Sequence, residues 1–352
     1  KNSGNLFLGE RGNKLLVIRP DINLIVDSVD TQSTPSDIRV ENKTIDLLEM
    51  GIMDPSDSAI GSWNSYKKEG LPASTSKLKT LNRPVNFEFG DLNGDGLEDL
   101  VICNFGNQLG SLAWYEKTAD GYLEHSLKKA PGARREILQD MTGNGLLDLV
   151  VLMAQAKEGI FIFYNQGNGT FHESSILRFS PVFGASDFEL VDFDKDGHLD
   201  ILLTNGDNAD LSQVFKPYHG VHIFQNNGHN QFQEKWFFPM YGASKALAAD
   251  FDSDGWVDIA AISFFPDYNQ TPRQDFIYFK GKDAWRFSPY VLEMPLKARW
   301  LTLETGDFDQ NGYLDLFMGS FMLNQLNSPS WEAGYFNEPW APFVILKNIS
   351  GN

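Results

Sequence analysis

One acidic sequence of nine residues occurs five times in this chain of 352 residues, and its side chains could hold metal ions. The pattern is Asp-x-[Asp/Asn/Thr]-x-[Asp/Asn]-Gly-x-x-Asp. The copies are Asp91–Asp99, Asp140–Asp148, Asp192–Asp200, Asp250–Asp258 and Asp307–Asp315. Oxygen side chains at positions 1, 3, 5 and 9, with a backbone carbonyl at position 7, form the kind of cage that Ca²⁺ prefers. Glycine at position 6 allows the sharp turn that brings these ligands together. We therefore predict up to five calcium sites.

The predicted metal ligands are the residues at positions 1, 3, 5, 7 and 9 of each copy. Ranked by carboxylates, the 192–200 and 250–258 loops come first, then 91–99 and 307–315, then 140–148. The ligands are Asp91, Asn93, Asp95, Leu97, Asp99; Asp140, Thr142, Asn144, Leu146, Asp148; Asp192, Asp194, Asp196, His198, Asp200; Asp250, Asp252, Asp254, Trp256, Asp258; Asp307, Asp309, Asn311, Tyr313 and Asp315.

The EF-hand is the obvious alternative for such loops, since it begins with a similar run of acidic residues. An EF-hand loop requires a bidentate glutamate at position 12 and a helix on each side. Position 12 is apolar in every copy here, which excludes the EF-hand. These residues are Ile102, Val151, Leu203, Ala261 and Met318.

The elements around the loops are predicted to be short strands. Each loop is followed by an apolar run of four to six residues, such as Leu100–Cys103 or Ile201–Thr204, and is preceded by a similar segment such as Asn86–Gly90. The loops start 49, 52, 58 and 57 residues apart. Four antiparallel strands repeated at this spacing are typical of a propeller blade.

These repeats resemble FG-GAP/VCBS repeats, the blades of the integrin α-subunit head and of many secreted bacterial proteins. The resemblance rests on the acidic loops, on Phe105-Gly106 and on strands such as Phe161–Phe171, and it covers residues 85–352. The phrases at 205–210, 216–228 and 261–268 resemble those of bacterial VCBS repeat-containing proteins. The resemblance implies an all-β, calcium-bearing β-propeller of four-stranded antiparallel blades, usually seven, with the metal loops between the first two strands of each blade.

The predicted organisation is a single propeller domain over residues 1–352. Residues 85–352 form five blades with metal loops, and residues 37–84 form a blade whose loop has decayed, with Ile38, Val40 and Asn42 at ligand positions. Residues 1–36 supply ring-closing strands, in which Asn5–Ile18 pairs near Phe343–Lys347. The number of blades is seven or six: either the N-terminal strands build a seventh, or Met322–Pro342 is a long insertion in the last.

The net charge and the cysteine content indicate which classes of partner and which cellular compartment fit this protein. The net charge is −18, and positions 1, 3, 5 and 9 of the five loops hold sixteen of the 47 acidic residues. Such acidity argues against nucleic acid as a partner, since phosphate binding needs a basic surface. The single cysteine, Cys103, is expected to be a buried, inert thiol. Together with calcium, this favours an extracytoplasmic bacterial protein, secreted, periplasmic or on the cell surface. The sequence starts without Met and shows no signal peptide, so we expect a processed segment. It also shows no membrane span, so we expect no insertion into a membrane. We further expect a monomer.

Catalytic motifs are scarce, so we predict no catalytic residue and no cofactor besides Ca²⁺, and whether the protein is an enzyme stays open. Long polar and aromatic loops are expected to gather on the face opposite the metal loops, where a saccharide could bind. The pairs Arg299-Trp300 and Arg134-Arg135 should place cations near the axis, for a ligand or for salt bridges between blades. The predicted ligand-binding residues are Asn208, Asp210, Tyr218, His219, Asp267, Tyr268 and Arg299.

Three classes of function fit this sequence. We favour a non-catalytic, calcium-stabilised module that binds a glycan or a protein. The alternatives are a sugar-acting enzyme, such as a polysaccharide lyase, and a structural or cell-adhesion domain that binds other proteins. Fold alone does not decide among them.

Overall fold

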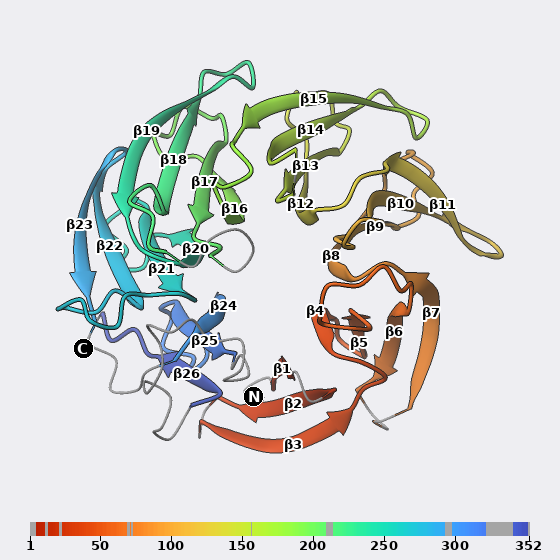
Figure 1. Ribbon diagram of the computed structural model, residues 1–352, viewed down its shortest axis with the longest axis horizontal. Helices are drawn as coiled ribbons and strands as arrows, with labels where there is room; N and C mark the ends of the chain where they lie inside the picture. Colours follow the sequence, from red (N-terminus) through yellow and green to blue (C-terminus); the bar gives the residue numbers. More distant parts are fainter. Residues whose placement is uncertain are drawn as a thin grey trace. The chain divides into compact units, whose positions relative to one another are not determined.

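In a computed structural model, the described residues of the chain form 26 strands in seven antiparallel sheets (Figure 1). The structure describes residues 5–10, 13–20, 23–68, 71, 73–155, 157–208, 214–292, 298–321 and 341–350, and within these ranges it contains no helix. Two compact units divide the described chain, Asn5–Pro181 and Val182–Asn352. We call them the N-terminal and the C-terminal unit.

The N-terminal unit contains four sheets, each formed by strands that follow one another in the chain. Their strands are β1 (Leu6–Glu10), β2 (Lys14–Arg19) and β3 (Leu24–Asp30); β4 (Pro35–Val40), β5 (Thr44–Glu49), β6 (Gly61–Lys67) and β7 (Ser74–Leu81); β8 (Pro84–Gly90), β9 (Asp99–Asn104), β10 (Ser111–Thr118) and β11 (Gly121–Lys128); β12 (Ala133–Gln139), β13 (Asp148–Met153), β14 (Gly159–Asn165) and β15 (Phe171–Arg178).

The C-terminal unit contains three sheets of the same kind. Their strands are β16 (Ala185–Val191), β17 (Asp200–Asn205), β18 (Gly220–Asn226) and β19 (Phe232–Pro239); β20 (Ala243–Ala249), β21 (Asp258–Ser263), β22 (Phe276–Asp283) and β23 (Arg286–Val291); β24 (Trp300–Gly306), β25 (Asp315–Ser320) and β26 (Phe343–Leu346).

The seven sheets are the blades of a β-propeller, which confirms the predicted fold class and decides between six and seven blades. Five blades have four strands, and β1–β2–β3 and β24–β25–β26 have three within the described residues. The N-terminal strands therefore form a blade of their own. Residues 322–340 of the candidate insertion Met322–Pro342 lie outside the described residues.

The prediction of a single domain, with its internal boundaries, concerns both units and stays a prediction. The predicted pairing of Asn5–Ile18 with Phe343–Lys347, which would close the ring of blades, also stays a prediction. Within each unit, β1 pairs with β2 and β26 pairs with β25. In the blade predicted to have lost its loop, Ile38 and Val40 lie in β4, and only residues 41–43 connect β4 to β5.

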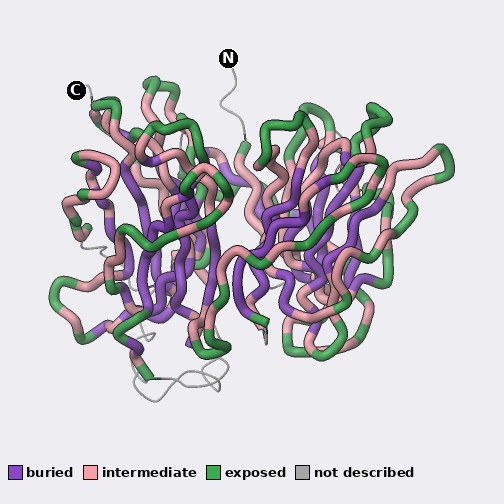
Figure 2. Tube along the Cα trace, turned by 90° about the horizontal axis from the view of Figure 1, so that it is seen from above, coloured by how far each residue is buried: buried purple, intermediate pink, exposed green. Residues whose placement is uncertain are grey.

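The core of each unit lies between neighbouring sheets. The second strand of a blade, such as β9 or β17, is buried along its whole length, because both of its faces are covered by adjacent sheets. Buried residues follow these strands, while exposed residues gather at the loops (Figure 2). The apolar residue at loop position 2 joins this core: Leu92 packs with Trp114 and Phe163, and Phe193 with Ile223 and Phe279.

The first strand of each four-stranded blade, called here the inner strand, borders the inner strand of the next blade within a unit, as β4, β8 and β12 do. Its pairing with the second strand is interrupted by an irregularity, for example between Pro84 and Asn86 in β8 and between Ala133 and Arg135 in β12. Such bulges change the direction of the side chains that follow. Asn86 and Arg135 are the residues that directly follow these irregularities, and they lie in adjacent blades.

Candidate metal centres

All five acidic loops connect the inner strand of a blade to its second strand. The 91–99 and 140–148 loops belong to the N-terminal unit, between β8 and β9 and between β12 and β13. The 192–200, 250–258 and 307–315 loops belong to the C-terminal unit. Because strands flank every loop, the exclusion of the EF-hand holds in the structure.

The five loops share one internal hydrogen-bond scaffold, which the 192–200 loop illustrates. The Asp192 carboxylate accepts the Gly197 N–H at 3.0 Å, and the Asp196 carboxylate accepts the His198 N–H at 2.8 Å. Gly197 has a φ of 87°, and the other glycines at position 6 have φ values of 80° to 91°. A Cβ at Gly197 would meet no atom within 4 Å, so the backbone conformation, and not lack of space, requires glycine there.

Position 4 also adopts the left-handed conformation, which the sequence pattern did not indicate. Gly94 and Gly143 occupy this position in the N-terminal unit. Lys195, Ser253 and Gln310 have φ values of 60°, 60° and 63° in the C-terminal unit. Non-glycine residues pay a conformational cost there, which the surrounding hydrogen bonds must offset.

The aspartate at position 9 ties each loop to the rest of its blade. In the 192–200 loop, the Asp200 carboxylate accepts the Phe193 N–H at 3.2 Å and the N–H of Asn226, in β18, at 2.8 Å. The other four copies make the same two bonds at 2.7–3.1 Å. Burial raises the pKa of Asp200 to about 6 against these donors, with a contribution from Asp194 and Asp196. This aspartate therefore has a structural role in addition to its predicted role as a ligand.

Three loops gather carboxylates closely enough to share one ion. Within the described residues, these groups have ligand atoms that all lie within 4.8 Å of one another: Asp192, Asp194 and Asp200; Asp250, Asp252 and Asp254; Asp307, Asp309 and Asp315. All three belong to the C-terminal unit. The two loops of the N-terminal unit have Asn93, Thr142 and Asn144 in place of carboxylates.

The 192–200 loop fits a hard cation. The Oδ1 atom of Asp194 is buried and has no hydrogen-bond partner among the described residues. Its Oδ2 atom accepts the side-chain amide of Gln225 at 2.6 Å. A buried carboxylate oxygen without a donor is costly unless a cation neutralises it, and Ca²⁺ takes oxygen ligands of this kind.

A residue on the third strand, or directly after it, faces position 3 of most loops, and the sequence pattern did not reveal it. This residue comes directly before the one that donates its N–H to the aspartate at position 9, as Gln225 comes before Asn226. Gln225 contacts Asp194, and Glu116 accepts the side-chain amide of Asn93 at 3.3 Å. In the other two cases the residue is a lysine. Lys280 contacts Asp252 and lies 3.1 Å from Asp254, and Lys347 lies 3.4 Å from Asp309.

No constant spacing reveals this position, because the connections between the second and third strands differ in length. The local signal is the residue before the turn at the end of the third strand, as in Gln225-Asn226-Asn227-Gly228. The hydrogen bonds to Asp252 and Asp254 raise the pKa of Lys280, so its ammonium stays charged.

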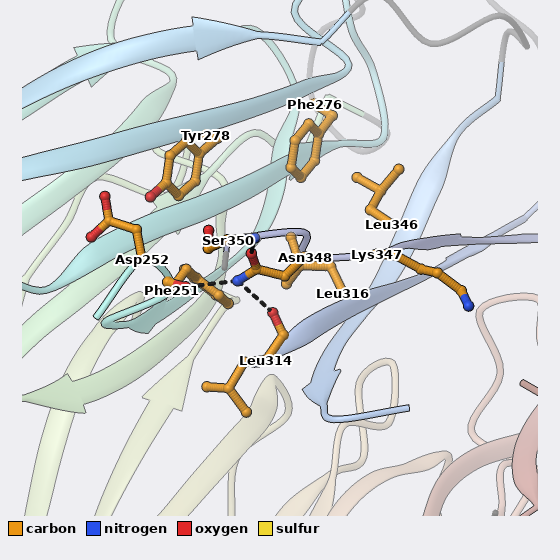
Figure 3. A pocket seen from close by; sticks show the side chains of 10 residues that line it. All are labelled: Phe251, Asp252, Phe276, Tyr278, Leu314, Leu316, Leu346, Lys347, Asn348 and Ser350. Carbon is orange, nitrogen blue, oxygen red and sulfur yellow. Dashed lines mark hydrogen bonds between the residues drawn. The ribbon is translucent and has the colours of Figure 1, made fainter. Parts of the chain in front are cut away.

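A cavity of about 360 Å³ opens beside the 250–258 loop, between the last two blades of the C-terminal unit (Figure 3). Asn348 spans it, donating to the carbonyl oxygens of Phe251 at 2.6 Å and Leu314 at 3.3 Å. Most of the lining is apolar, with Asp252 and Lys347 as its charged members. The lining residues are Phe251, Asp252, Phe276, Tyr278, Leu314, Leu316, Leu346, Lys347, Asn348 and Ser350.

The residues predicted to bind a saccharide fall in the C-terminal unit, and most of those described are buried. Asp210 lies outside the described residues. Asn208, Tyr218 and His219 belong to the β17–β18 connection. Asn208 and His219 are buried, and burial lowers the pKa of His219 to about 4, which makes its ring neutral. Tyr218 is 38% exposed, stacks on Phe183 and donates its hydroxyl to the Val182 carbonyl at 3.0 Å.

Tyr268 and Arg299 form a second group. The Tyr268 hydroxyl donates to the carbonyl of Ala298 at 3.0 Å, and both side chains are buried. Arg299 lies over the ring of Phe265, 5.2 Å from its centroid, and burial lowers its pKa to about 10. Asp267 is partly exposed in the β21–β22 connection. A hydrogen bond to the backbone thus joins Tyr268 to the residue before Arg299, and the binding role of the set stays a prediction.

A second, polar cavity of about 380 Å³ lies on the inner strands of the N-terminal unit. Asn86 donates to the Asp37 carboxylate at 2.6 Å, and its side-chain oxygen accepts the Glu136 N–H at 2.9 Å. Burial raises the pKa of Asp37 and Glu88, in Glu88 with the added repulsion of Asp37. The lining residues are Asp37, Ile38, Arg39, Asn86, Phe87, Glu88, Phe89 and Arg135. The sequence analysis placed a cation near the axis at Arg134-Arg135 but not these carboxyls.

Two further observations bear on compartment and redox chemistry. Cys103, in β9, is buried as predicted, and burial raises the pKa of its thiol well above the ordinary value. Across the described residues, no helix combines the length and the hydropathy that a membrane crossing would need.

Comparison with solved structures shows the fold. A chain of an S. cerevisiae complex of Dbp5, Nup159 and Gle1 matches with a TM-score of 0.51 at 10% identity, over 90% of this chain and 84% of that one. The N-terminal domain of Nup159 matches with a TM-score of 0.50 at 13% identity, over 91% and 85%. A protein from Lactobacillus plantarum matches with a TM-score of 0.54 at 12% identity, over 87% and 84%. At these identities the matches indicate shared architecture.

Comparison by sequence identifies the repeat. No curated protein matches the chain. A family model described as an FG-GAP-like repeat matches residues 140–203 and 250–318, which contain the acidic loops of four blades. The chain therefore carries FG-GAP-like repeats in a seven-bladed β-propeller, consistent with the FG-GAP/VCBS repeat family.

Proposed function

We propose that this protein is an extracytoplasmic, calcium-stabilised β-propeller that recognises a saccharide without transforming it. Ca²⁺ would be held by the side chains at positions 1, 3, 5 and 9 and the carbonyl at position 7 of the acidic loops. The ion would supply charge neutralisation to the carboxylates that each loop gathers. The protein's own hydrogen bonds already hold the loops in shape, so binding requires little reorganisation.

The observation that carries the calcium proposal is the buried Oδ1 atom of Asp194. It lies in a group with Asp192 and Asp200 whose ligand atoms are within 4.8 Å of one another. Without a cation, such a group combines mutual repulsion with the loss of hydration. A divalent ion relieves both effects at once.

The test is calorimetry of EDTA-treated protein with and without added Ca²⁺. An ion that binds the native state alone stabilises by about 2.7 kcal/mol per site at a hundredfold excess over Kd, so Ca²⁺ should raise the melting temperature clearly. Asp194→Ala should reduce this gain. Asp120→Ala, in the exposed turn between β10 and β11, is the control and should leave it intact. An identical melting curve with EDTA and with Ca²⁺ would refute calcium binding.

The proposed compartment follows from the ion. Loops of moderate affinity fill at the millimolar Ca²⁺ found outside the cytosol. The fold also needs no disulfide, since Cys103 is the single cysteine in the sequence. Fractionation of the cells that produce the protein checks this: we expect it with periplasmic, surface or medium markers, and recovery with cytosolic markers would contradict the proposal.

For the saccharide, the polar cavity of the N-terminal unit supports recognition best. Carboxyl, amide and guanidinium groups converge there from two adjacent inner strands and the start of β12. Planar polar groups of this kind exchange hydrogen bonds with neighbouring hydroxyls. The predicted loop residues of the C-terminal unit remain a second proposed location, in which Tyr218 and Asp267 are the accessible members of the described set.

A glycan array on the intact chain, with and without Ca²⁺, tests recognition and separates the two locations. Glu88→Gln should weaken binding at the cavity, whereas Tyr218→Ala should weaken binding at the loops. We expect loss with the first variant and retention with the second. If neither variant changes glycan binding, or if no glycan binds at all, saccharide recognition at the cavity and at the loops is excluded, and a protein ligand is favoured.

One observation favours a second candidate function, a sugar-acting enzyme. Burial at the cavity raises the pKa values of Asp37 and Glu88, which is the direction in which a general acid is tuned. Incubation of the array's bound glycans with the protein, followed by chromatography for shortened or unsaturated products, distinguishes this candidate. Products that disappear in Glu88→Gln would establish it.

A further inference from the structure

Carboxylate count alone ranks the 192–200 and 250–258 loops as equals, yet their surroundings differ. Both have aspartate at positions 1, 3, 5 and 9, and both have the same internal hydrogen bonds. What differs is the side chain that β18 or β22 brings to position 3. In the 192–200 loop it is the neutral amide of Gln225, and in the 250–258 loop it is the ammonium of Lys280.

The Lys280 ammonium occupies the position of a cation in its loop. It donates a hydrogen bond to Asp252 and lies 3.1 Å from the Asp254 carboxylate. These are two of the three carboxylates whose ligand atoms gather within 4.8 Å, the third being Asp250. An ammonium has three donors and one positive charge, so it can satisfy two carboxylates at once.

A second lysine approaches the same loop from its neighbour. Lys195, at position 4 of the 192–200 loop, donates to the Gly255 carbonyl at 2.5 Å. Its ammonium also lies over the Trp256 ring, 4.2 Å from the centroid. Two positive charges therefore face the 250–258 loop. In the 192–200 loop, by contrast, Asp194 retains a buried oxygen without a hydrogen-bond donor among the described residues.

We propose that Lys280 is the resident cation of the 250–258 loop and keeps Ca²⁺ out of it. The inference rests on the proposed calcium binding of the sister loops, and it reverses the rank that carboxylate count predicts for this one. A divalent ion could enter only if Lys280 released both carboxylates and its ammonium moved away, because two cations this close together repel each other. The blade β20–β23 would then be held together independently of calcium.

The test measures bound Ca²⁺ per chain by equilibrium dialysis at millimolar free Ca²⁺, on the full-length chain. Lys280→Gln and Lys280→Met should each bind one more Ca²⁺ than the wild type. Lys282→Gln, on the same strand, removes an equal charge from an exposed side chain and should add none. The reciprocal change, Gln225→Lys, should weaken Ca²⁺ binding at the 192–200 loop at least tenfold.

The new ion can be assigned to its loop by Tb³⁺ luminescence, since Trp256 stands at position 7. Lys280→Gln should gain Tb³⁺ emission excited through tryptophan, and the added change Trp256→Phe should remove that gain. If neither Lys280 variant binds more Ca²⁺ than the wild type, the inference is wrong, whatever the other loops do. If the wild type binds no Ca²⁺ while a Lys280 variant binds one, the inference stands and calcium binding by the sister loops fails.

Discussion

The blades β16–β19 and β20–β23 are neighbours in the C-terminal unit and differ in how they neutralise buried charge. At the loop end, Asp194 faces the amide of Gln225, whereas Asp252 faces the ammonium of Lys280. At the opposite end, the first blade buries the neutral ring of His219. The second buries Asp275, whose carboxylate lies 3.4 Å from the Arg273 guanidinium.

Under the proposed calcium binding, one loop sequence serves two purposes. The blade β20–β23 supplies the ammonium of Lys280 to its own loop carboxylates. The blade β16–β19 supplies the neutral amide of Gln225, and the proposed ion would neutralise the remaining carboxylate charge. The repeat motif therefore fixes the shape of a loop, while the third strand determines what the loop requires.

The largest expected effect concerns the feature that the two blades share, the aspartate at position 9. Asp200→Ala and Asp258→Ala should each lower the free energy of unfolding by about 4 kcal/mol in EDTA, because two backbone N–H groups lose a charged acceptor. Urea titration measures this. A loss that appears in Ca²⁺ but vanishes in EDTA would mean that the aspartate acts as a metal ligand and not as a structural tie.

The ion pair of the second blade should come next. Arg273→Ala should cost about 3 kcal/mol, because Asp275 is fully buried and would lose its nearby opposite charge. Burial already raises the pKa of Asp275 against the influence of Arg273. Asp275→Asn is the matched control and should cost less. Equal losses in both variants would show that packing, and not charge, accounts for the effect.

The buried imidazole of the first blade predicts a pH dependence. The pKa of His219 is lowered to about 4 from 6.5, mainly by burial and also by Lys216 and His222. A group with a depressed cationic pKa contributes stability above 6.5 and loses it as the pH falls toward 4. Between pH 7.5 and 5, the wild type should lose about 2 kcal/mol more than His219→Gln. Parallel pH profiles would show that this ring is not neutral in the folded state.

The smallest effect should come from the other lysine-facing loop. Lys347 lies 3.4 Å from Asp309 with 48% of its side chain exposed, so Lys347→Gln should change the free energy of unfolding in EDTA by less than about 1 kcal/mol. Its gain in Ca²⁺ affinity should also be smaller than that of Lys280→Gln. If Lys347→Gln gained more Ca²⁺ affinity than Lys280→Gln, the exposure of the lysine would not explain how strongly it excludes the ion.

The sequence by itself determined the repeat, the strands that flank each loop and the positions of the acidic side chains within each loop. These follow from local rules: glycine at Gly197 is required by the backbone, and an apolar run such as Ile201–Thr204 forms a buried strand wherever it occurs in this unit. The predicted blade number stayed at six or seven because the N-terminal strands carry no acidic loop. Their pairing as β1–β2–β3 decided it.

Tertiary structure alone decided which side chains meet. The distance along the chain from Asp200 to Gln225 differs from that between Asp258 and Lys280, so no spacing rule brings a third-strand residue to its loop. Strand register does so, because the position-9 aspartate binds the next N–H along that strand. Likewise, Asp37, Asn86 and Arg135 are far apart in sequence and line one cavity because they lie on successive inner strands. Long-range contacts of this kind depend on the packing of whole sheets, which a local sequence pattern does not encode.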